Sequence, residues 1–138
     1  MPKRLLLLFS TLFLSACANT ASFHRDADEM VTVEIEHARS AEERAIGLMN
    51  RQELCSQCGM LFDFNETRHV SMWMKNTLIS LDMFYISEDM IVTEIFENTI
   101  PHSLEGLKSS QPVRYVLETN AGFAKQHNIQ VGDRLVLR

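Results

Sequence analysis

The sequence predicts an α+β fold: a mostly antiparallel β-sheet, compact and curled or closed into a small barrel, with two short helices. Three observations predict it. About seven short segments are either apolar or alternate between apolar and polar residues, as β-strands do. Two other segments carry signals that begin or end helices. The chain has 138 residues with only 3 Pro and 5 Gly and shows no internal period, which argues against a repeat or low-complexity protein.

Two elements are predicted at the start of the domain. The segment Val31–Ile35 alternates apolar and polar residues and indicates a half-buried strand. Ser40 is followed three residues later by Glu43, which is the pattern of a capping box, so a short helix is expected there. Gly47 weakens this helix or allows another backbone to come close.

Further strands and a second helix are predicted along the rest of the chain. Ile79–Ile86 is apolar on both faces apart from Asp82, which indicates a central strand, and a turn leads from it into Ile91–Phe96 as a hairpin. Asn120 is expected to cap the second helix, and Asn128 to end it. The other predicted strands are Gly59–Phe64, Val70–Lys75, Val113–Glu118 and Arg134–Leu137, with a polar loop over residues 101–112.

The first seventeen residues predict an export signal. Lys3 and Arg4 form a basic start, and the apolar run Leu5–Leu14 is too short to span a bilayer. The following Leu14-Ser15-Ala16-Cys17 resembles the lipobox of bacterial lipoproteins, which implies that Cys17 is lipidated and that the mature chain begins there. The alternative is an ordinary cleaved signal with a chance cysteine.

These assignments divide the chain into three parts: a lipoprotein signal peptide at 1–16, the lipidated cysteine and a tether at 17–28, and a single β-rich domain at 29–138. Several acyl chains on Cys17 would hold the protein at a membrane. The expected location is therefore the bacterial cell envelope, facing the periplasm. By resemblance to enterobacterial sorting, Ala18 favours the outer over the inner membrane.

The charge of the chain excludes one class of partner. Without Lys3 and Arg4, the 13 basic residues fall to 11 against 18 acidic residues, a net charge of −7. An acidic domain is poorly suited to nucleic acid or to anionic lipid surfaces, so nucleic acid is not an expected partner.

The two remaining cysteines, Cys55 and Cys58, form a C-x2-C pair in an exported protein. A short structural disulfide is the first interpretation. Half of a metal site and a redox-active pair of thioredoxin type remain open. The pair precedes an apparent strand, whereas a redox motif is expected at the start of a helix.

A series of motifs in order resembles the domain of unknown function 192 family, also named uncharacterised protein family 0127. The likeness covers about residues 31–137. It implies a small β-rich α+β domain, often exported or lipid-anchored, and supplies no reaction; Cys55 and Cys58 fall in the family's variable stretch. The motifs are Gly47-Leu48-Met49, Gly59-Met60-Leu61-Phe62, Trp73-Met74-Lys75-Asn76-Thr77, Leu81-Asp82, Glu97-Asn98, Arg114-Tyr115-Val116-Leu117-Glu118, Ala121-Gly122 and Gly132-Asp133.

A polar island between apolar strands is the first candidate site. Lys75, Asn76 and Thr77 are expected at a turn that ends a strand, where loops build sites on a rigid scaffold. Asp82 interrupts a buried run, and a buried carboxylate is costly unless it is paired or hydrogen-bonded. A purely structural Asp82 would accept hydrogen bonds from the Asn76-Thr77 turn or pair with Lys75 or Arg114; a ligand-binding Asp82 is the alternative.

Other strand ends could meet this turn and form a cleft for a small polar ligand such as a sugar or an amine. Two carboxylates there could instead cleave a glycan, or could simply be solvated. No elbow of the G-x-S-x-G type, phosphate loop or H-E-x-x-H motif is present, and no cofactor is expected. The predicted cleft residues are Trp73, Lys75, Asn76, Thr77, Asp82, Glu97, Asn98 and Glu118.

A copper site is the second hypothesis. Thioether and imidazole groups bind Cu(I), and Met72 and Met74 share one face of a predicted strand close to His69. Alternating methionines on a strand are more commonly core residues. The other four histidines, His24, His37, His102 and His127, show no ligand spacing.

The sequence thus favours a noncatalytic, lipid-anchored envelope protein that binds a small polar ligand or an envelope partner. A periplasmic Cu(I)-binding protein is the alternative, and a hydrolase of an envelope glycan is the third possibility.

Overall fold

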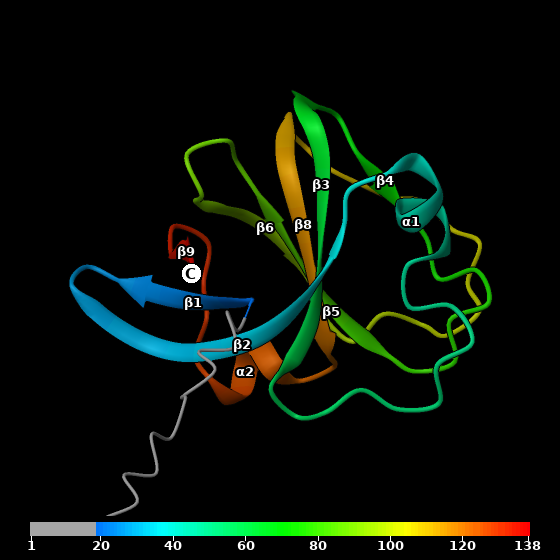
Figure 1. Cartoon of the computed structure of the whole chain (residues 1–138), viewed down its shortest axis with the longest axis horizontal. Helices are drawn as coiled ribbons and strands as arrows, with labels where there is room; N and C mark the ends of the chain where they lie inside the picture. Colours follow the sequence, from blue (N-terminus) through cyan, green and yellow to red (C-terminus); the bar gives the residue numbers. More distant parts are fainter. Residues whose placement is uncertain (1–18) are drawn as a thin grey trace, which may run out of the picture.

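The computed structural model describes residues 19–138, which form a strongly curved β structure with two short helices (Figure 1). The signal peptide and Cys17 lie outside these residues. The elements are β1 (Thr20–Arg25), β2 (Asp28–Ala38), α1 (Ala41–Ile46), β3 (Cys58–Arg68), β4 (Ser71–Met72), β5 (Leu81–Ile86), β6 (Val92–Phe96), β7 (Leu107–Lys108), β8 (Val113–Asn120), α2 (Phe123–Gln126) and β9 (Arg134–Leu137).

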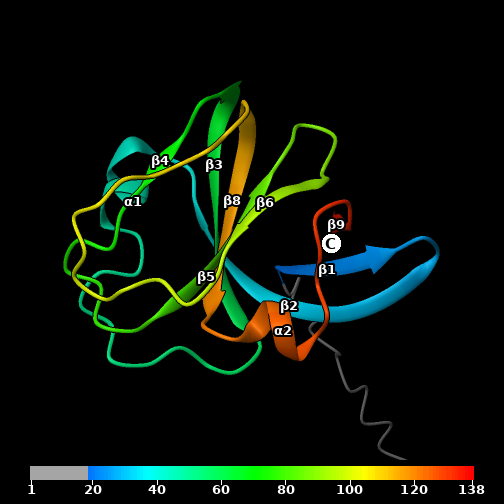
Figure 2. The ribbon, with the colours of Figure 1, turned by 180° about the vertical axis from the view of Figure 1, so that it is seen from behind.

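Seven strands form one sheet in the order β6-β5-β8-β3-β2-β1-β9, and β4 pairs with β7 in a small second sheet. The large sheet curls until its two ends approach each other, as Figures 1 and 2 show from opposite sides. An isolated bridge joins Ile91 to Arg134, and the amide of Leu135 donates to the carbonyl of Met90 at 2.8 Å. The predicted α+β class with a curled sheet is confirmed in this form.

One strand pair departs from the antiparallel expectation. β2 and β3 run parallel, with Ile35 opposite Gly59. The physical reason is the long connection between them: it contains α1, and a parallel pair needs such a crossover.

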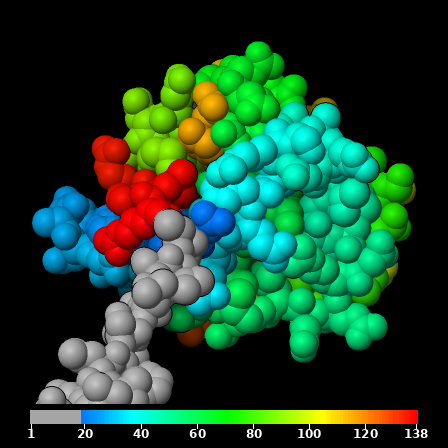
Figure 3. Space-filling model, in the orientation of Figure 1, coloured from blue at the N-terminus to red at the C-terminus, as the bar shows by residue number. Residues whose placement is uncertain are grey.

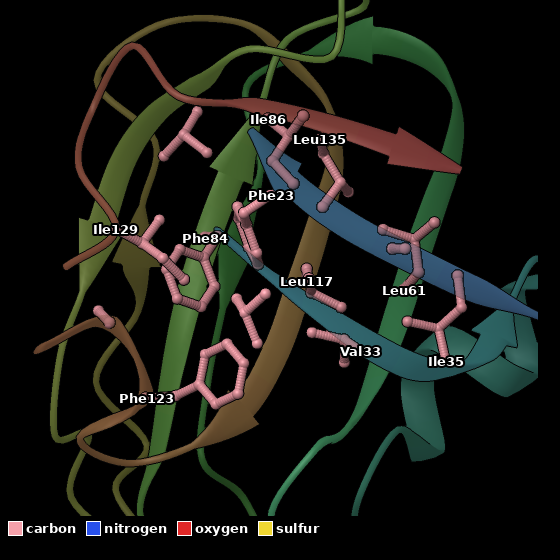
Figure 4. Packing of buried hydrophobic residues seen from close by; sticks show 14 residues of the cluster. Phe23, Val33, Ile35, Leu61, Phe84, Ile86, Leu117, Phe123, Ile129 and Leu135 are labelled. Carbon is pink, nitrogen blue, oxygen red and sulfur yellow. The ribbon is translucent and has the colours of Figure 1, made fainter. Parts of the chain in front are cut away.

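Two hydrophobic cores lie on the two faces of the central strands. The inner core, enclosed by the curl, contains the rings of Phe23, Phe84 and Phe123 (Figure 4). The centroids of Phe23 and Phe84 are 4.9 Å apart, and Phe84 meets Phe123 edge to face. All six residues of β5 are buried, which confirms that it is a central strand.

The outer core lies between the central strands and the layer made by the segment after α1 and the β4–β7 pair. It contains Leu48, Phe62 and Tyr85 together with four methionines: Met60, Met72, Met74 and Met83. Figure 3 shows the segment from α1 to β3, in cyan to blue-green, forming much of the surface on the right. The chain therefore covers both faces of its own sheet.

The two helices begin by different means. At α1 the predicted capping box is present: the amide of Glu43 donates to the Ser40 hydroxyl at 3.1 Å, and the amide of Ser40 donates to the Glu43 carboxylate at 2.8 Å. α2 begins after Gly122, whose φ is 85°, without a side-chain cap. Asn120 was predicted as that cap but instead donates its side-chain amide to Leu54 and Cys55 carbonyls, both at 2.9 Å.

Three segments differ from their predicted state. Residues 20–25, expected within the tether 17–28, form β1 because Ala21 and Phe23 are buried in the inner core. The predicted strand Val70–Lys75 is shortened to β4, and β7 lies within the predicted polar loop, since these two segments pair with each other. No helix among residues 19–138 is long and apolar enough to cross a membrane.

Candidate functional site

The central feature of the site is Glu118 on β8. In the register of the sheet it lies opposite Met60 of β3 and opposite Met83 of β5, so thioether side chains flank it on both sides. Strand alternation places it on the same face as Val116, toward the outer core. Glu118 is only 4% exposed.

Glu118 borders a small cleft between the end of α1 and the segment after β4. Gly47, Leu48 and Met49 form one wall, and Trp73 stands on the other side with Lys75. The enclosed space is about 20 Å³, which is enough for about one water molecule. Gly47 has a φ of 49°, and a Cβ there would lie 3.0 Å from the Phe62 ring, so glycine permits this wall to pack closely.

Burial alone sets the protonation of this carboxyl group. It raises the pKa of Glu118 to about 8, and no hydrogen bond or ion pair within residues 19–138 counteracts it. The group is therefore mostly neutral at pH 7, when it can donate one hydrogen bond and accept others. A buried carboxyl group with a raised pKa beside a cleft is a common property of functional sites.

Four of the eight predicted cleft residues border this space: Trp73, Lys75, Thr77 and Glu118. Trp73 is 46% exposed, and the Lys75 ammonium lies 5.1 Å from the centre of its ring, a cation–π distance. The Thr77 side chain is buried and donates to the Lys75 carbonyl at 3.2 Å. The structure therefore joins the predicted turn to the end of β8.

The other predicted residues lie elsewhere. Asn76 is exposed in the left-handed region, with φ 52°, and does not border the cleft. Glu97 and Asn98 line a second cleft of about 220 Å³ with Met74, Phe96 and the loop that follows. Because Glu97 and Glu118 border different clefts, the two carboxylates needed for glycan cleavage are not brought together.

Asp82 is fully buried and has a structural role. Its carboxylate accepts hydrogen bonds from the backbone amides of Asn98 at 2.8 Å and Ala124 at 3.0 Å. These partners differ from those predicted, namely the Asn76-Thr77 turn, Lys75 or Arg114. Arg114 pairs with Asp63 instead, at 2.8 Å. Asp82 thus ties β5 to the loop after β6 and to the start of α2.

The residues proposed for copper do not meet in one cleft. His69 is exposed, with its ring nitrogen 3.3 Å from the Ser109 carbonyl oxygen. Met72 borders the Glu118 cleft, whereas Met74 lines the second cleft. Within residues 19–138, no three His, Cys, Asp or Glu side chains are grouped to hold a metal ion.

The cysteine pair forms the disulfide of the first interpretation. Cys55 and Cys58 have their Cα atoms 5.1 Å apart and close the turn that leads into β3. The two carbonyls held by Asn120 lie in the same segment. The bond therefore fixes the loop that connects the α1 layer to the central sheet.

Sequence reasoning missed the contribution of α1 and the residues after it. Arg44 and Leu48 border the cleft although they are far from Trp73 and Glu118 in the sequence. Gly47-Leu48-Met49 is one of the motifs by which the sequence resembles its family, and that resemblance was the available signal for this wall.

The fold and the cleft define a small domain that has a mixed, curled sheet and a largely buried glutamic acid bordering a cleft at the surface. The model of the DUF192 family, described as an uncharacterized ACR, matches residues 22–137, and the chain belongs to this family. A suggested transcription regulator from Sinorhizobium meliloti 1021 is 41% identical with a TM-score of 0.84, over 86% of this chain and 92% of that chain. A protein of unknown function from Novosphingobium aromaticivorans DSM 12444 is 32% identical with a TM-score of 0.80, over 85% and 83% of the two chains. A comparison with curated proteins finds no match.

Replacing Asp82 tests its structural role. Asp82→Ala leaves two amides without an acceptor, so the free energy of unfolding should fall by about 3 kcal/mol in urea denaturation. Asp28→Ala, at an exposed position, should change it by less than about 0.5 kcal/mol. Equal effects of the two substitutions would refute the assigned role of Asp82.

Glu118 should make stability depend on pH. In the unfolded chain, the pKa of Glu118 returns to about 4.5. Between that value and about 8 the native state keeps a proton that the unfolded state has lost, so stability falls as pH rises, by up to about 1.4 kcal/mol per pH unit. Above about pH 8 this contribution levels off. Glu118→Gln removes this titrating group. The free energy of unfolding of the variant, measured in urea, should therefore increase relative to that of the wild type as pH rises across this window. Parallel curves for the two proteins would contradict the raised pKa.

Proposed function

We propose that this chain is a lipid-anchored cell-envelope protein that binds a small polar ligand in the cleft bounded by Trp73, Lys75, Thr77 and Glu118. The observation that carries the proposal is Glu118, a residue that is 4% exposed, borders the cleft and has no hydrogen-bond partner for its carboxyl group among residues 19–138. Because no fully buried side-chain oxygen among these residues lacks a partner, the carboxyl oxygens open toward the cleft, and removing most of this acid from water still costs free energy. A ligand that hydrogen-bonds to it would offset that cost.

Two alternatives receive less support from the geometry. Glycan hydrolysis by a carboxylate pair lacks its second carboxylate in this cleft, and Cu(I) binding lacks an imidazole beside Met72 and Met74. A role in transcription, suggested for the Sinorhizobium meliloti protein, does not suit the net charge of −5 of this chain. Ligand binding at Glu118 is therefore the favoured function.

Native mass spectrometry of the protein purified in detergent from bacterial envelopes tests the ligand. We expect a stoichiometric adduct on the wild-type protein that denaturation removes. Glu118→Met, which removes both the donor and the acceptor of the neutral carboxyl group, should lower its occupancy at least about tenfold.

Glu97→Met is the matched control, since Glu97 lines the second cleft. Loss of the adduct with Glu97→Met alone would move the site to that cleft. A bare wild-type mass, together with unchanged amide NMR shifts when envelope extract is added, would overturn ligand binding.

The anchor is proposed from the sequence pattern that ends at Cys17. Cys17→Ser should prevent acylation, so the protein should move from the membrane fraction to the soluble fraction and its intact mass should lack the acyl groups. The control is Cys55→Ser with Cys58→Ser, which should leave the protein in the membrane fraction. An unchanged distribution and mass for Cys17→Ser would exclude lipidation at this residue.

A further inference from the structure

The Glu118 cleft continues into a neighbouring open cleft across the surface of α1 and β4. The two clefts share Arg44, Ala45, Met72 and Trp73 as lining residues. The neighbouring cleft has a volume of about 290 Å³ and adds Phe64, Arg68 and Ser71 to the lining. We call the two together the α1 groove. It is long enough to hold more than the single small group that fits beside Glu118.

Positive charge gathers along this groove. The guanidinium groups of Arg44 and Arg68 lie 5.5 Å and 5.2 Å from the centre of the same Phe64 ring. Arg44 is held in place by donating to the backbone carbonyls of Arg39 and Asp63. Lys75 adds a third cation at the other end, above Trp73.

These three cations have no acidic partner within residues 19–138. Other basic residues of this acidic chain do: Arg25, Arg51, Arg114 and Arg138 each form a salt bridge. Among residues 19–138, Glu118 is the only carboxyl-bearing residue that lines the groove, and its carboxyl group is mostly neutral at pH 7. The groove is therefore a local positive surface on a chain of net charge −5, and its charge complements an anion.

Trp73 gives the groove an apolar centre. It is 46% exposed and, like Arg44, lines both clefts. A large exposed aromatic ring in a polar groove suits a ligand with an apolar ring face and polar edges. A pyranose sugar has this form, because its C–H groups present an apolar face and its hydroxyl groups lie at the edge.

We propose that the α1 groove binds an acidic pyranose sugar: its ring lies on Trp73, its carboxylate pairs with Arg68, and a small polar substituent enters the cleft beside Glu118. The proposal rests on the proposed function and names the class of its ligand. The planar guanidinium groups can hold a carboxylate through two parallel hydrogen bonds. The space of about 20 Å³ beside Glu118 admits a hydroxyl group or the end of an amide, but no whole ring.

Two sugars that differ by one O-lactyl group, which carries the carboxylate, test the proposal. N-acetylmuramic acid carries a lactyl carboxylate that N-acetylglucosamine lacks. The chain has 1 Trp, so its fluorescence reports on the groove directly. We titrate the full-length protein in detergent with each sugar and expect N-acetylmuramic acid to bind about tenfold more tightly, as one charge-assisted contact provides.

Substitutions assign the contact. Arg68→Gln should weaken the binding of N-acetylmuramic acid about tenfold, to the level of N-acetylglucosamine, and leave the second sugar unchanged. Arg134→Gln is the control, because Arg134 lies outside the groove and forms no salt bridge within residues 19–138. Circular dichroism verifies that both variants are folded.

Three results would overturn the proposal: equal affinity for the two sugars, no change in Trp73 fluorescence with either, or equal binding of free lactate, which would show that the sugar ring is not recognised. These results are separable from failure of the proposed function. A native adduct that depends on Glu118 but is not displaced by N-acetylmuramic acid would leave the Glu118 cleft as a binding site and refute only its ligand class. An adduct that Glu118→Met does not affect would refute the site itself.

Discussion

Burial of the central strands on both faces is the constraint on which this structure depends. β5 has no exposed residue, and β8 and β3 send apolar side chains to either side. A sheet of this kind must be covered twice. The chain covers one face by curling the sheet until Ile91 bridges Arg134, and the other by folding the segment after α1 and the β4–β7 pair across it. The two cores, the mixed strand order and the groove under α1 all follow from this double cover.

The same constraint explains why an acid came to be buried. Strand alternation sends Val116 and Glu118 to the outer face, and the outer layer closes over Val116 but leaves a narrow opening above Glu118. The backbone there has little freedom, because a Cβ at Gly59 would lie 2.6 Å from the Glu118 carbonyl oxygen. β3 and β8 therefore approach each other closely at this point and hold the carboxyl group at a fixed depth.

Local patterns in the sequence were sufficient for the elements whose partners are local. The capping box of Ser40 and Glu43 and the apolar run of β5 were predicted from neighbouring residues alone. β1 was missed although Ala21 and Phe23 alternate with polar residues, because the segment is short and its only large apolar side chain, Phe23, gains its burial from the distant inner core. The partners of Asp82 and the placement of Glu97 away from Glu118 could not be predicted, since they depend on how strand ends distant in sequence are ordered in the sheet.

The position of β1 restricts how far the domain could travel from a bilayer. On the proposed anchor, only Ala18 and Asn19 separate Cys17 from Thr20, and β1 is hydrogen-bonded to β2 on one side and β9 on the other. Three Cα–Cα steps span about 10 Å. The domain would rest against the lipid headgroups with the N-terminal end of β1 nearest to them. Such a protein would act only on what reaches the membrane surface.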